Sequence, residues 1–530
     1  MKKTTKSLLV ISLALLGGCV LTPTDNATDE IHTKRTPTPI GKIALKSEIK
    51  LPTDLSSPKI EQPPKNVWER LFKSYKLSDI DHTRVEQERN WYLKHPTYLK
   101  RVQKRAEPYL YFIATETEQR NLPAELALLP IVESAFQPFA YSHGRAAGLW
   151  QFIPSTARGF GLKQNWWYDG RRDVYASTQT ALGYLERLNK RFSGDWLLAL
   201  AAYNSGGGTV SKAIRKNKKR NRPTDYWSLD LPKETRSYVP KLLAIASIFA
   251  NADKYGIELI DIPNRPQFTV IDTESQLDLA LAAEMAEIPI EALYKLNPGF
   301  NRWSTDPDGP HRLLIPQDKS ELFKEKLAQL PPSQRVKWTR HRIRQGETLG
   351  HIANRYNTSL AAVKRVNNIS GHSIRAGKYL LIPTSTQNLA HYSLSQAQRN
   401  LAKLSAKRKG QKRIHTVKAG DTLWDIARSH SVSTRQLASW NNMAPRDTLK
   451  LGQKLAIWTK GSRHKNSASP INPFKSVNYT VRSGDSLYLI ARKFNVSIPE
   501  LRKWNRKRIG KYLKPGQRLR VNVDITKPTV

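Results

Sequence analysis

The sequence is poor in cysteine, in long apolar runs and in acidic residues. Its single cysteine, Cys19, excludes an intramolecular disulfide and a thiol-rich metal site. The apolar run Leu8–Leu16 is too short to be a convincing membrane-spanning helix. Only 44 Asp and Glu stand against 87 Lys and Arg, which gives a formal net charge of +43, so anionic partners are expected. The 530 residues are too many for one ordinary core and predict three or four structural units.

The N-terminal residues follow the order of an export signal. A basic region, Met1–Lys6, precedes the apolar run, and two glycines then lead to Cys19. This order resembles a bacterial lipoprotein signal, which implies removal of residues 1–18 and lipidation of Cys19, where each buried methylene contributes about 0.8 kcal/mol. Val20 stands where an aspartate would favour the inner membrane, so the periplasmic face of the outer membrane is expected. The alternative is a secreted protein whose signal ends nearby.

Residues 19–65 are predicted to be a lipidated N-terminus and flexible tether. They are rich in Thr, Pro, Ser and Lys and contain few large apolar groups. A helical domain is expected to follow over residues 66–260.

Glu133 is the candidate catalytic residue of that domain. Leu122, Leu126 and Leu129 recur at helical spacing and lead along one stripe to its carboxyl. Burial would raise the pKa of that carboxyl, as a general acid requires. Pro130 is expected to bend the helix just before Glu133 and turn the carboxyl toward a cleft. Taken alone, Glu133 is more simply a core acid satisfied by a neighbour.

Four motifs occur in order over about a hundred residues: Glu133–Ser134, Ser142–Ala157, Ala201–Gly208 and Glu234–Pro240. Together they resemble the lytic transglycosylase family of the goose-type lysozyme superfamily. The resemblance implies a mainly α, lysozyme-like catalytic domain. It also implies a sugar-binding cleft, whose expected substrate-binding residues are Ser134, Ser142, Gln151, Tyr203, Asn204, Glu234 and Tyr238.

Local patterns agree with parts of this resemblance. Asp195 can cap a helix that ends at the glycines after Asn204, which leaves Tyr203 beside a loop. Its ring can pack on a sugar face, although a core tyrosine with a solvated hydroxyl is the alternative. Gly144 and Gly148 flank a turn at which backbone is expected to approach a ligand.

The motifs offer no second acid at a partner position, although ordinary glycosidases need two carboxylates. Asp169 and Asp173 are better explained as a turn residue and a helix cap, and Glu125 as an acid in a first helical turn. The resemblance implies a non-hydrolytic reaction in which Glu133 protonates the glycosidic oxygen between N-acetylmuramic acid and N-acetylglucosamine. Glu133 then takes the proton of the muramic 6-hydroxyl, which closes onto C1 as a 1,6-anhydro ring. No cofactor or metal is expected.

Three C-terminal segments share one pattern. Each has a β-branched strand position, a Gly-acid-Thr/Ser turn and, 21 residues after the glycine, an asparagine; the three pairs are Gly346 and Asn367, Gly420 and Asn441, and Gly484 and Asn505. Helical spacing follows each turn, and Ser433 and Ser497 begin predicted capping boxes.

These segments resemble LysM modules, small α+β units of strand-helix-helix-strand (βααβ) order that bind N-acetylglucosamine-containing glycans. The resemblance places the turn residues near sugar: Gly346, Glu347, Thr348, Gly420, Asp421, Thr422, Gly484, Asp485 and Ser486. The expected modules cover 340–384, 413–458 and 477–522, with flexible linkers at 385–412 and 459–476. A purely structural repeat is the alternative.

A fainter copy is predicted over residues 265–318. Leu279 to Asn297 keeps the 18-residue interval of Leu349 to Asn367, but the glycine turn is missing, so glycan binding there is doubtful.

The expected partners are peptidoglycan strands and, through Cys19, a membrane. The positive charge is spread over linkers and repeats without a nucleic-acid motif, so nucleic acid is not an expected partner. Other cell-wall proteins that bind or restrain the chain are not identified by the sequence. A hydrolytic muramidase and a noncatalytic wall-binding scaffold remain the competing functions.

Overall fold

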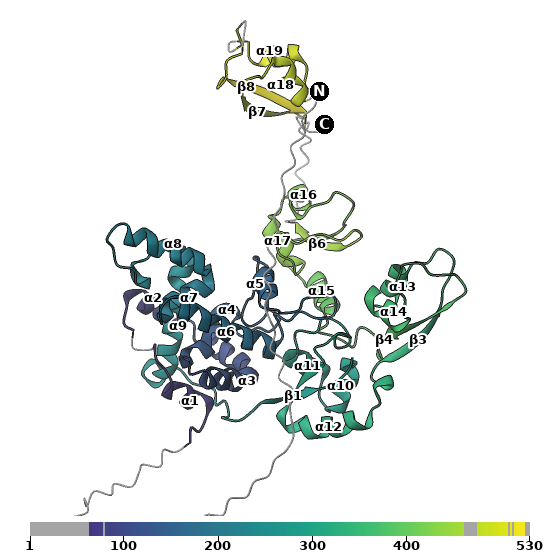
Figure 1. Ribbon diagram of the computed structural model, residues 1–530. Helices are drawn as coiled ribbons and strands as arrows, with labels where there is room; N and C mark the ends of the chain where they lie inside the picture. The colour runs from purple at the N-terminus through teal and green to yellow at the C-terminus, as the bar shows by residue number, and fades with distance from the viewer. Residues whose placement is uncertain are drawn as a thin grey trace, which may run out of the picture. The chain divides into compact units, whose positions relative to one another are not determined.

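The computed structural model describes residues 63–77, 80–459, 474–494, 496–506, 509–510 and 513–524 (Figure 1). The predicted signal peptide, the lipidation site at Cys19 and most of the tether lie outside the described residues. Within these described ranges, no helix is both long and apolar enough to cross a bilayer.

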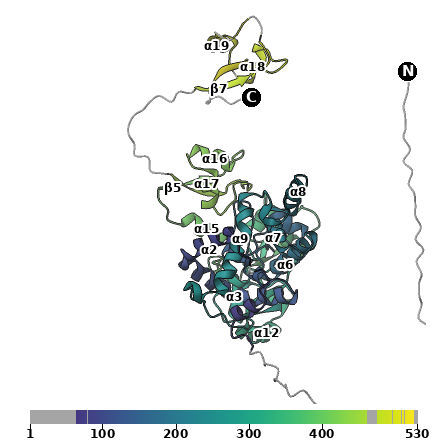
Figure 2. The same ribbon diagram turned by 90° about the vertical axis from the view of Figure 1, so that its left-hand side faces the viewer.

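The first described part is a helical domain with one core. Its α-helices are α1 (Val67–Lys73), α2 (Thr83–Leu93), α3 (Pro96–Gln119), α4 (Leu129–Ser134), α5 (Pro154–Gly159), α6 (Val174–Arg191), α7 (Trp196–Ser205), α8 (Gly207–Lys218) and α9 (Lys233–Ala250). Short 3-10 helices cover Ala124–Leu128, Tyr226–Ser228 and Asp253–Tyr255. Helices α2, α3, α6, α7 and α9 gather together in both views (Figure 1, Figure 2).

Helix α7 lies in the centre of this domain. Its residues 198–202 are all buried, which is typical of a helix surrounded by others. Asp195 caps α7 by accepting a hydrogen bond from the Leu198 amide at 2.9 Å, and Asp173 caps α6 in the same way, both as predicted. The two caps fix where α6 and α7 begin.

The prediction of one continuous helix running to Glu133 is wrong. A 3-10 helix, Ala124–Leu128, is followed by the separate short helix α4. Pro130 lies in the first turn of α4, where the missing N–H breaks no hydrogen bond, so the proline starts a helix and does not bend one. Ala135 and Phe136 have φ angles of 51° and 52° and end α4 directly after Glu133 and Ser134.

Four βααβ units follow, which confirms the predicted class of the three repeats. The units are β1 (Phe268–Asp272), α10 (Leu279–Met285), α11 (Ile290–Leu296), β2 (Arg312–Pro316); β3 (Lys337–Arg342), α13 (Leu349–Arg355), α14 (Leu360–Val366), β4 (Tyr379–Thr384); β5 (Gln411–Thr416), α16 (Leu423–Ser429), α17 (Thr434–Trp440), β6 (Lys454–Thr459); and β7 (Phe474–Thr480), α18 (Leu487–Lys493), α19 (Ile498–Trp504), β8 (Arg518–Asp524). In each unit the two strands pair antiparallel. Ser433 and Ser497 form the predicted capping boxes.

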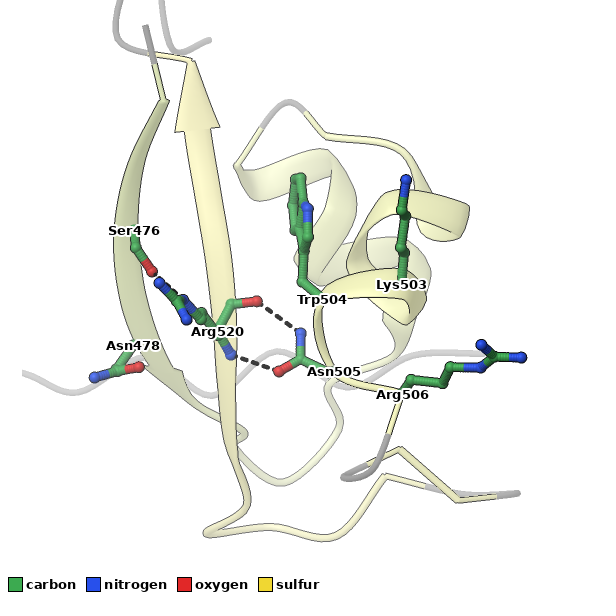
Figure 3. Close-up of a pocket in the computed structure, with 7 residues that line it drawn as sticks. All are labelled: Ser476, Asn478, Lys503, Trp504, Asn505, Arg506 and Arg520. Atoms are coloured by element: carbon green, nitrogen blue, oxygen red, sulfur yellow. Dashed lines mark hydrogen bonds between the residues drawn. The ribbon is translucent and has the colours of Figure 1, made fainter. Parts of the chain in front are cut away.

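The asparagine that recurs in the repeats joins the second helix to the last strand. In the final unit the Asn505 side chain donates to the carbonyls of Leu501 and Arg520 at 2.9 and 2.6 Å and accepts from the Arg520 amide at 2.7 Å (Figure 3). Asn297, Asn367 and Asn441 make the same three hydrogen bonds in the other units. We call this arrangement the asparagine clamp, and it explains why each unit has an asparagine at the end of its second helix.

The first βααβ unit is extended by 3-10 helices Gln317–Lys319 and Pro332–Gln334 and by α12 (Ser320–Gln329). It contacts the helical domain through backbone: the Asp169 amide donates to the Gly299 carbonyl at 2.8 Å, and the Asn301 amide donates to the Trp167 carbonyl at 2.7 Å. A Cβ on Gly299 would lie 2.8 Å from the Tyr168 ring, so only glycine fits this contact.

The linker predicted over 385–412 contains structure. Tyr392 is 1% exposed and donates to both carboxylate oxygens of Asp278 at 2.9 and 2.8 Å. Helix α15 (Gln396–Ser405) follows it. The linker prediction missed this contact because Tyr392 finds its partner 114 residues away in the sequence.

Candidate active site

A cavity of about 470 Å³ opens between α4, α5, α7 and α9, and we call it the catalytic cleft. Seven predicted site residues line it: Glu133, Ser142, Gln151, Tyr203, Asn204, Glu234 and Tyr238. Ser134 does not line it. Ser134 is buried, and its hydroxyl bonds the carbonyls of Pro130 and Leu149 at 3.1 and 2.9 Å, so it ties α4 to the loop that carries Gln151.

Glu133 lies at the last turn of α4 with its carboxyl in the catalytic cleft. The pKa of Glu133 is raised to about 8, mainly by burial and to a smaller extent by the negative charge of Glu234, and this net value includes the opposing effect of a hydrogen bond from the Tyr238 hydroxyl. Desolvation therefore outweighs the hydrogen bond. At neutral pH the carboxyl holds a proton that it can donate.

Tyr238 and Tyr203 approach the cleft from different helices. Tyr238, on α9, is buried and donates its hydroxyl proton to Glu133 Oε1. Tyr203, on α7, donates to the Trp150 carbonyl at 3.0 Å and packs near the Tyr184 ring, with centroids 5.5 Å apart. Burial raises the pKa of both tyrosines well above the usual value, so both hydroxyls remain protonated donors at physiological pH.

Asn204 and Glu234 connect α7 to the start of α9. The Asn204 side-chain oxygen accepts a hydrogen bond from the Thr235 hydroxyl at 2.8 Å. Glu234 stands in the first turn of α9, where the helix dipole favours a negative charge. Thr235 thus fixes the position of the Asn204 amide beside Glu234.

The loop from Ser142 to Gln151 forms one wall of the cleft. Ser142 Oγ accepts from the Ala146 amide at 3.0 Å, and the Gln151 amide group donates to the Gly148 carbonyl at 2.8 Å. Gln151 has a φ angle of 47°, an uncommon conformation for a residue with a side chain. These hydrogen bonds hold the loop in a tight shape.

Gly148 makes a close approach to the protein's own backbone, and the expected approach of this turn to a ligand stays a prediction. A Cβ at this position would lie 2.0 Å from the Arg171 carbonyl oxygen, and its φ angle is 81°. Asp169 fixes this loop by forming ion pairs with Arg171 and Arg172, both at 2.8 Å. The glycine is therefore required by packing between two loops.

The other acids considered from sequence have structural positions. Glu125 is fully buried, and its carboxylate accepts hydrogen bonds from the backbone amides of Lys76 at 2.9 Å and Leu77 at 2.5 Å. Asp169 lies in its predicted turn with its two arginines, and Asp173 caps α6. Glu133 and Glu234 are the carboxylates among the residues that line the catalytic cleft.

Several lining residues were not predicted: Val132, Trp150, Phe152, Ile153, Thr156, Tyr184 and Lys241. Lys241 is one turn of α9 beyond Tyr238, so helical spacing alone could have placed it on the same face. Tyr184, on α6, gives no such signal because it comes from a different part of the sequence.

The turn residues of the three repeats have well-defined internal roles. Gly346, Gly420 and Gly484 have φ angles of 79°, 86° and 85°, which suit glycine. Thr348, Thr422 and Ser486 cap α13, α16 and α18.

The acid of each turn also bonds within its own module. Glu347, Asp421 and Asp485 accept backbone amides at 2.9, 2.8 and 2.7 Å. They also contact the first-strand side chains His341, His415 and Tyr479 at 2.8, 2.7 and 2.8 Å. These contacts account for the residue types without a ligand, so sugar contact at these positions stays a prediction.

A separate hollow of about 570 Å³ lies in the last module, between the strands and the end of α19 (Figure 3). Its cationic residues are Lys503, Arg506 and Arg520, and Figure 3 shows Lys503 and Arg506 extending away from Arg520. Across the described ranges, no group of three or more His, Cys, Asp or Glu side chains is arranged to hold a metal ion.

Comparison with known families agrees with this geometry. The description "Transglycosylase SLT domain" matches residues 110–225, and "Lytic transglycosylase MltD, LysM-like domain" matches residues 267–332. "LysM domain" matches residues 341–383, 415–458 and 479–522.

Two curated relatives show how far the similarity extends. The chain is 36% identical over 457 residues to membrane-bound lytic murein transglycosylase D of Escherichia coli (strain K12), covering 86% of this chain and 85% of the relative. It is 52% identical over 132 residues to a putative tributyltin chloride resistance protein of Alteromonas sp. (strain M-1), covering 25% of this chain and 63% of the relative.

A solved structure of an inactive mutant of the lytic transglycosylase Slt from Pseudomonas aeruginosa also matches. It is 25% identical, with coverage of 28% of this chain and 25% of that chain. The TM-score is 0.22, which is too low to add anything on the fold.

The helical domain, which holds Glu133 in its cleft, and the LysM modules together define a lytic murein transglycosylase. The chain belongs to the family of membrane-bound lytic murein transglycosylase D, and its first βααβ unit is the LysM-like domain of that family.

Proposed function

We propose that the enzyme cleaves the bond between N-acetylmuramic acid and N-acetylglucosamine without water, using Glu133 as its one general acid and base. Glu133 donates its proton to the glycosidic oxygen as the bond from C1 to that oxygen breaks. The muramic 6-hydroxyl then forms the bond to C1 and returns its proton to Glu133. No atom is added, so the products together have the mass of the substrate and one carries a 1,6-anhydro ring.

The observation that carries this proposal is the raised pKa of Glu133, about 8, in a cleft where the Tyr238 hydroxyl contacts the same carboxyl. A protonated carboxyl can act as the acid, and the tyrosine hydrogen bond stabilises the carboxylate that results. One group can therefore serve both half-reactions.

Hydrolysis is the second candidate because Glu234 brings another carboxylate to the same cleft. A hydrolase would use that group to activate water or to form a covalent intermediate. The two reactions differ in their products: hydrolysis leaves a reducing end that is heavier by one water.

We further propose that the LysM modules hold the enzyme on glycan strands and that lipidated Cys19 anchors it to the membrane. Tethered binding modules raise the effective concentration of an enzyme on insoluble substrate. The Escherichia coli relative is named a membrane-bound lytic murein transglycosylase, which supports the anchor.

The decisive experiment is mass spectrometry of muropeptides released from purified sacculi by the soluble chain that begins after Cys19, beside its Glu133→Gln variant. We expect anhydro products from the wild type and none from the variant. Reducing-end products from the wild type would establish hydrolysis instead. Release of nothing by either protein would favour the noncatalytic scaffold.

A further inference from the structure

A second cavity of about 350 Å³ adjoins the catalytic cleft. Val132 and Lys241 line both cavities, so the two are neighbours at the residue next to Glu133 and at α9. The remaining walls come from α2, the start of α3 and α4. Helix α2 and the start of α3 precede residue 110, where the family match to the transglycosylase domain begins.

The wall formed by α2 and α3 is aromatic. Trp91 is 49% exposed, and its ring stacks on His95 with centroids 4.2 Å apart. Tyr92 and Tyr98 meet the Trp91 ring edge-on, at 5.1 and 6.1 Å. The indole is thus fixed by its neighbours while much of its surface remains open to solvent.

Charged groups complete this second cavity. Glu88 is half-buried, and burial raises its pKa, although the positive charge of Lys241 lowers it. An exposed aromatic face combined with a few convergent polar groups is the arrangement that fixes the orientation of a small polar ring. The cavity therefore combines an apolar surface with a carboxylate and an ammonium group.

We propose that the Trp91 cavity is a subsite for one N-acetylated sugar of the glycan strand, beyond the sugars that flank the cleaved bond. This inference rests on the proposed function, because the strand must cross the catalytic cleft to reach Val132 and Lys241. The indole carries one face of the pyranose, and Glu88 accepts hydrogen bonds from its hydroxyl or amide groups. A sugar bound in this cavity makes the enzyme prefer strands that are long enough to fill both cavities.

The test measures kcat/KM of the soluble chain on peptide-free glycan strands of defined length. For Trp91→Ala we expect a loss of about five- to tenfold on long strands, the size of an aromatic contact, with no change on the shortest strand that is cleaved. Trp91→Phe should recover most of the loss, because a smaller ring still supplies a flat face.

Trp227→Ala is the matched control. Trp227 lies in the same domain and also stacks on a histidine, His82 at 3.8 Å, but it lines neither cavity. This variant should leave the dependence on strand length unchanged.

Three results would overturn the proposal. An equal loss of kcat/KM at every strand length for Trp91→Ala would indicate a structural role. No loss of kcat/KM at any length would show that the cavity does not bind sugar. A loss confined to strands that keep their peptides would assign the cavity to the peptide stem. Failure of the proposed function would appear separately, as reducing-end products from the wild type.

Discussion

Glu133 is the residue whose chemistry depends most on its surroundings. The same carboxyl is pushed toward its protonated form by burial and by Glu234, and toward its ionised form by Tyr238. In the proposed reaction Glu133 first gives a proton and then takes one back, and such a balance suits both steps because neither protonation state is stabilised strongly over the other. Changes at the two neighbours should move this balance in opposite directions.

Tyr238→Phe and Glu234→Gln therefore form a matched pair in a pH profile. For the wild type, kcat/KM on soluble glycan strands should fall as pH rises through about 8, because Glu133 loses the proton that it donates. Tyr238→Phe removes the hydrogen bond that lowers this pKa, so the fall should move to higher pH. Glu234→Gln removes a negative charge that raises the pKa, so the fall should move to lower pH. Shifts of both variants in the same direction would contradict the assignment of Glu133 as the titrating acid.

At the scale of elements, the asparagine clamp shows which repeated residues maintain the module fold. The Asn505 side chain satisfies a backbone amide and two carbonyls with one amide group. The backbone groups at the end of the helix and at the edge of the strand lack backbone partners there, and the asparagine side chain supplies the missing hydrogen bonds.

We expect Asn505→Ala to destabilise the last module by about 1–2 kcal/mol, because it leaves the partly buried amide and carbonyl of Arg520 without these hydrogen bonds. In the full-length variant, hydrogen exchange at the Arg520 amide should be faster than in the wild type, because this amide donates a hydrogen bond to the Asn505 side chain. Asn478→Ala, an exposed position on the neighbouring strand β7, serves as the control (Figure 3). Equal protection of the Arg520 amide in both variants would show that the clamp does not stabilise the module.

Local signals predicted the elements well where one short segment decides the structure. Strand positions, the capping serines Ser433 and Ser497, and the caps Asp173 and Asp195 all follow from neighbouring residues. The helix before Glu133 was predicted wrongly because the pattern of leucines spans a 3-10 helix and an α-helix with nearly the same period.

Contacts between distant segments could not be predicted in this way. Gly148 packs on the Arg171 carbonyl and Tyr392 bonds Asp278, and neither pair is adjacent in the sequence. Trp91, Tyr184 and Lys241 likewise reach their cavities from separate helices. The four motifs together were sufficient to predict seven residues of the catalytic cleft, whereas the second cavity required the folded arrangement of α2 against α4 and α9.

At the scale of the whole molecule, the last LysM module is one of the strongly basic parts of the chain. Residues 477–522 contain 12 Lys and Arg and two acids, within a chain of net charge +43. Peptidoglycan stems are anionic, so long-range attraction adds to any specific sugar contact. Exposed charges of this kind are screened by salt.

Binding of the soluble chain to purified sacculi should therefore weaken several-fold when salt is raised from low to high concentration. Cleavage of short, peptide-free strands should change much less, because a short strand carries only the few lactyl carboxylates of its muramic residues and has far fewer charges than a sacculus. A Lys503→Gln, Arg520→Gln double variant should show a smaller salt effect than the wild type, measured by co-sedimentation. A salt effect equal for sacculi and short strands would show that charge acts on the catalytic cleft and not on wall attachment.

The asparagine clamp has a consequence for how the four βααβ units can differ from one another. The clamp lies at the end of the second helix, whereas the glycine turn lies at the start of the first, so either can change while the other persists. The unit over residues 267–332 has the clamp residue Asn297 but no glycine turn, and its backbone bonds Trp167 and Asp169 of the helical domain. A LysM-like unit can therefore form part of the enzyme body, because the hydrogen bonds that join its second helix to its last strand do not involve the turn that is expected to contact sugar.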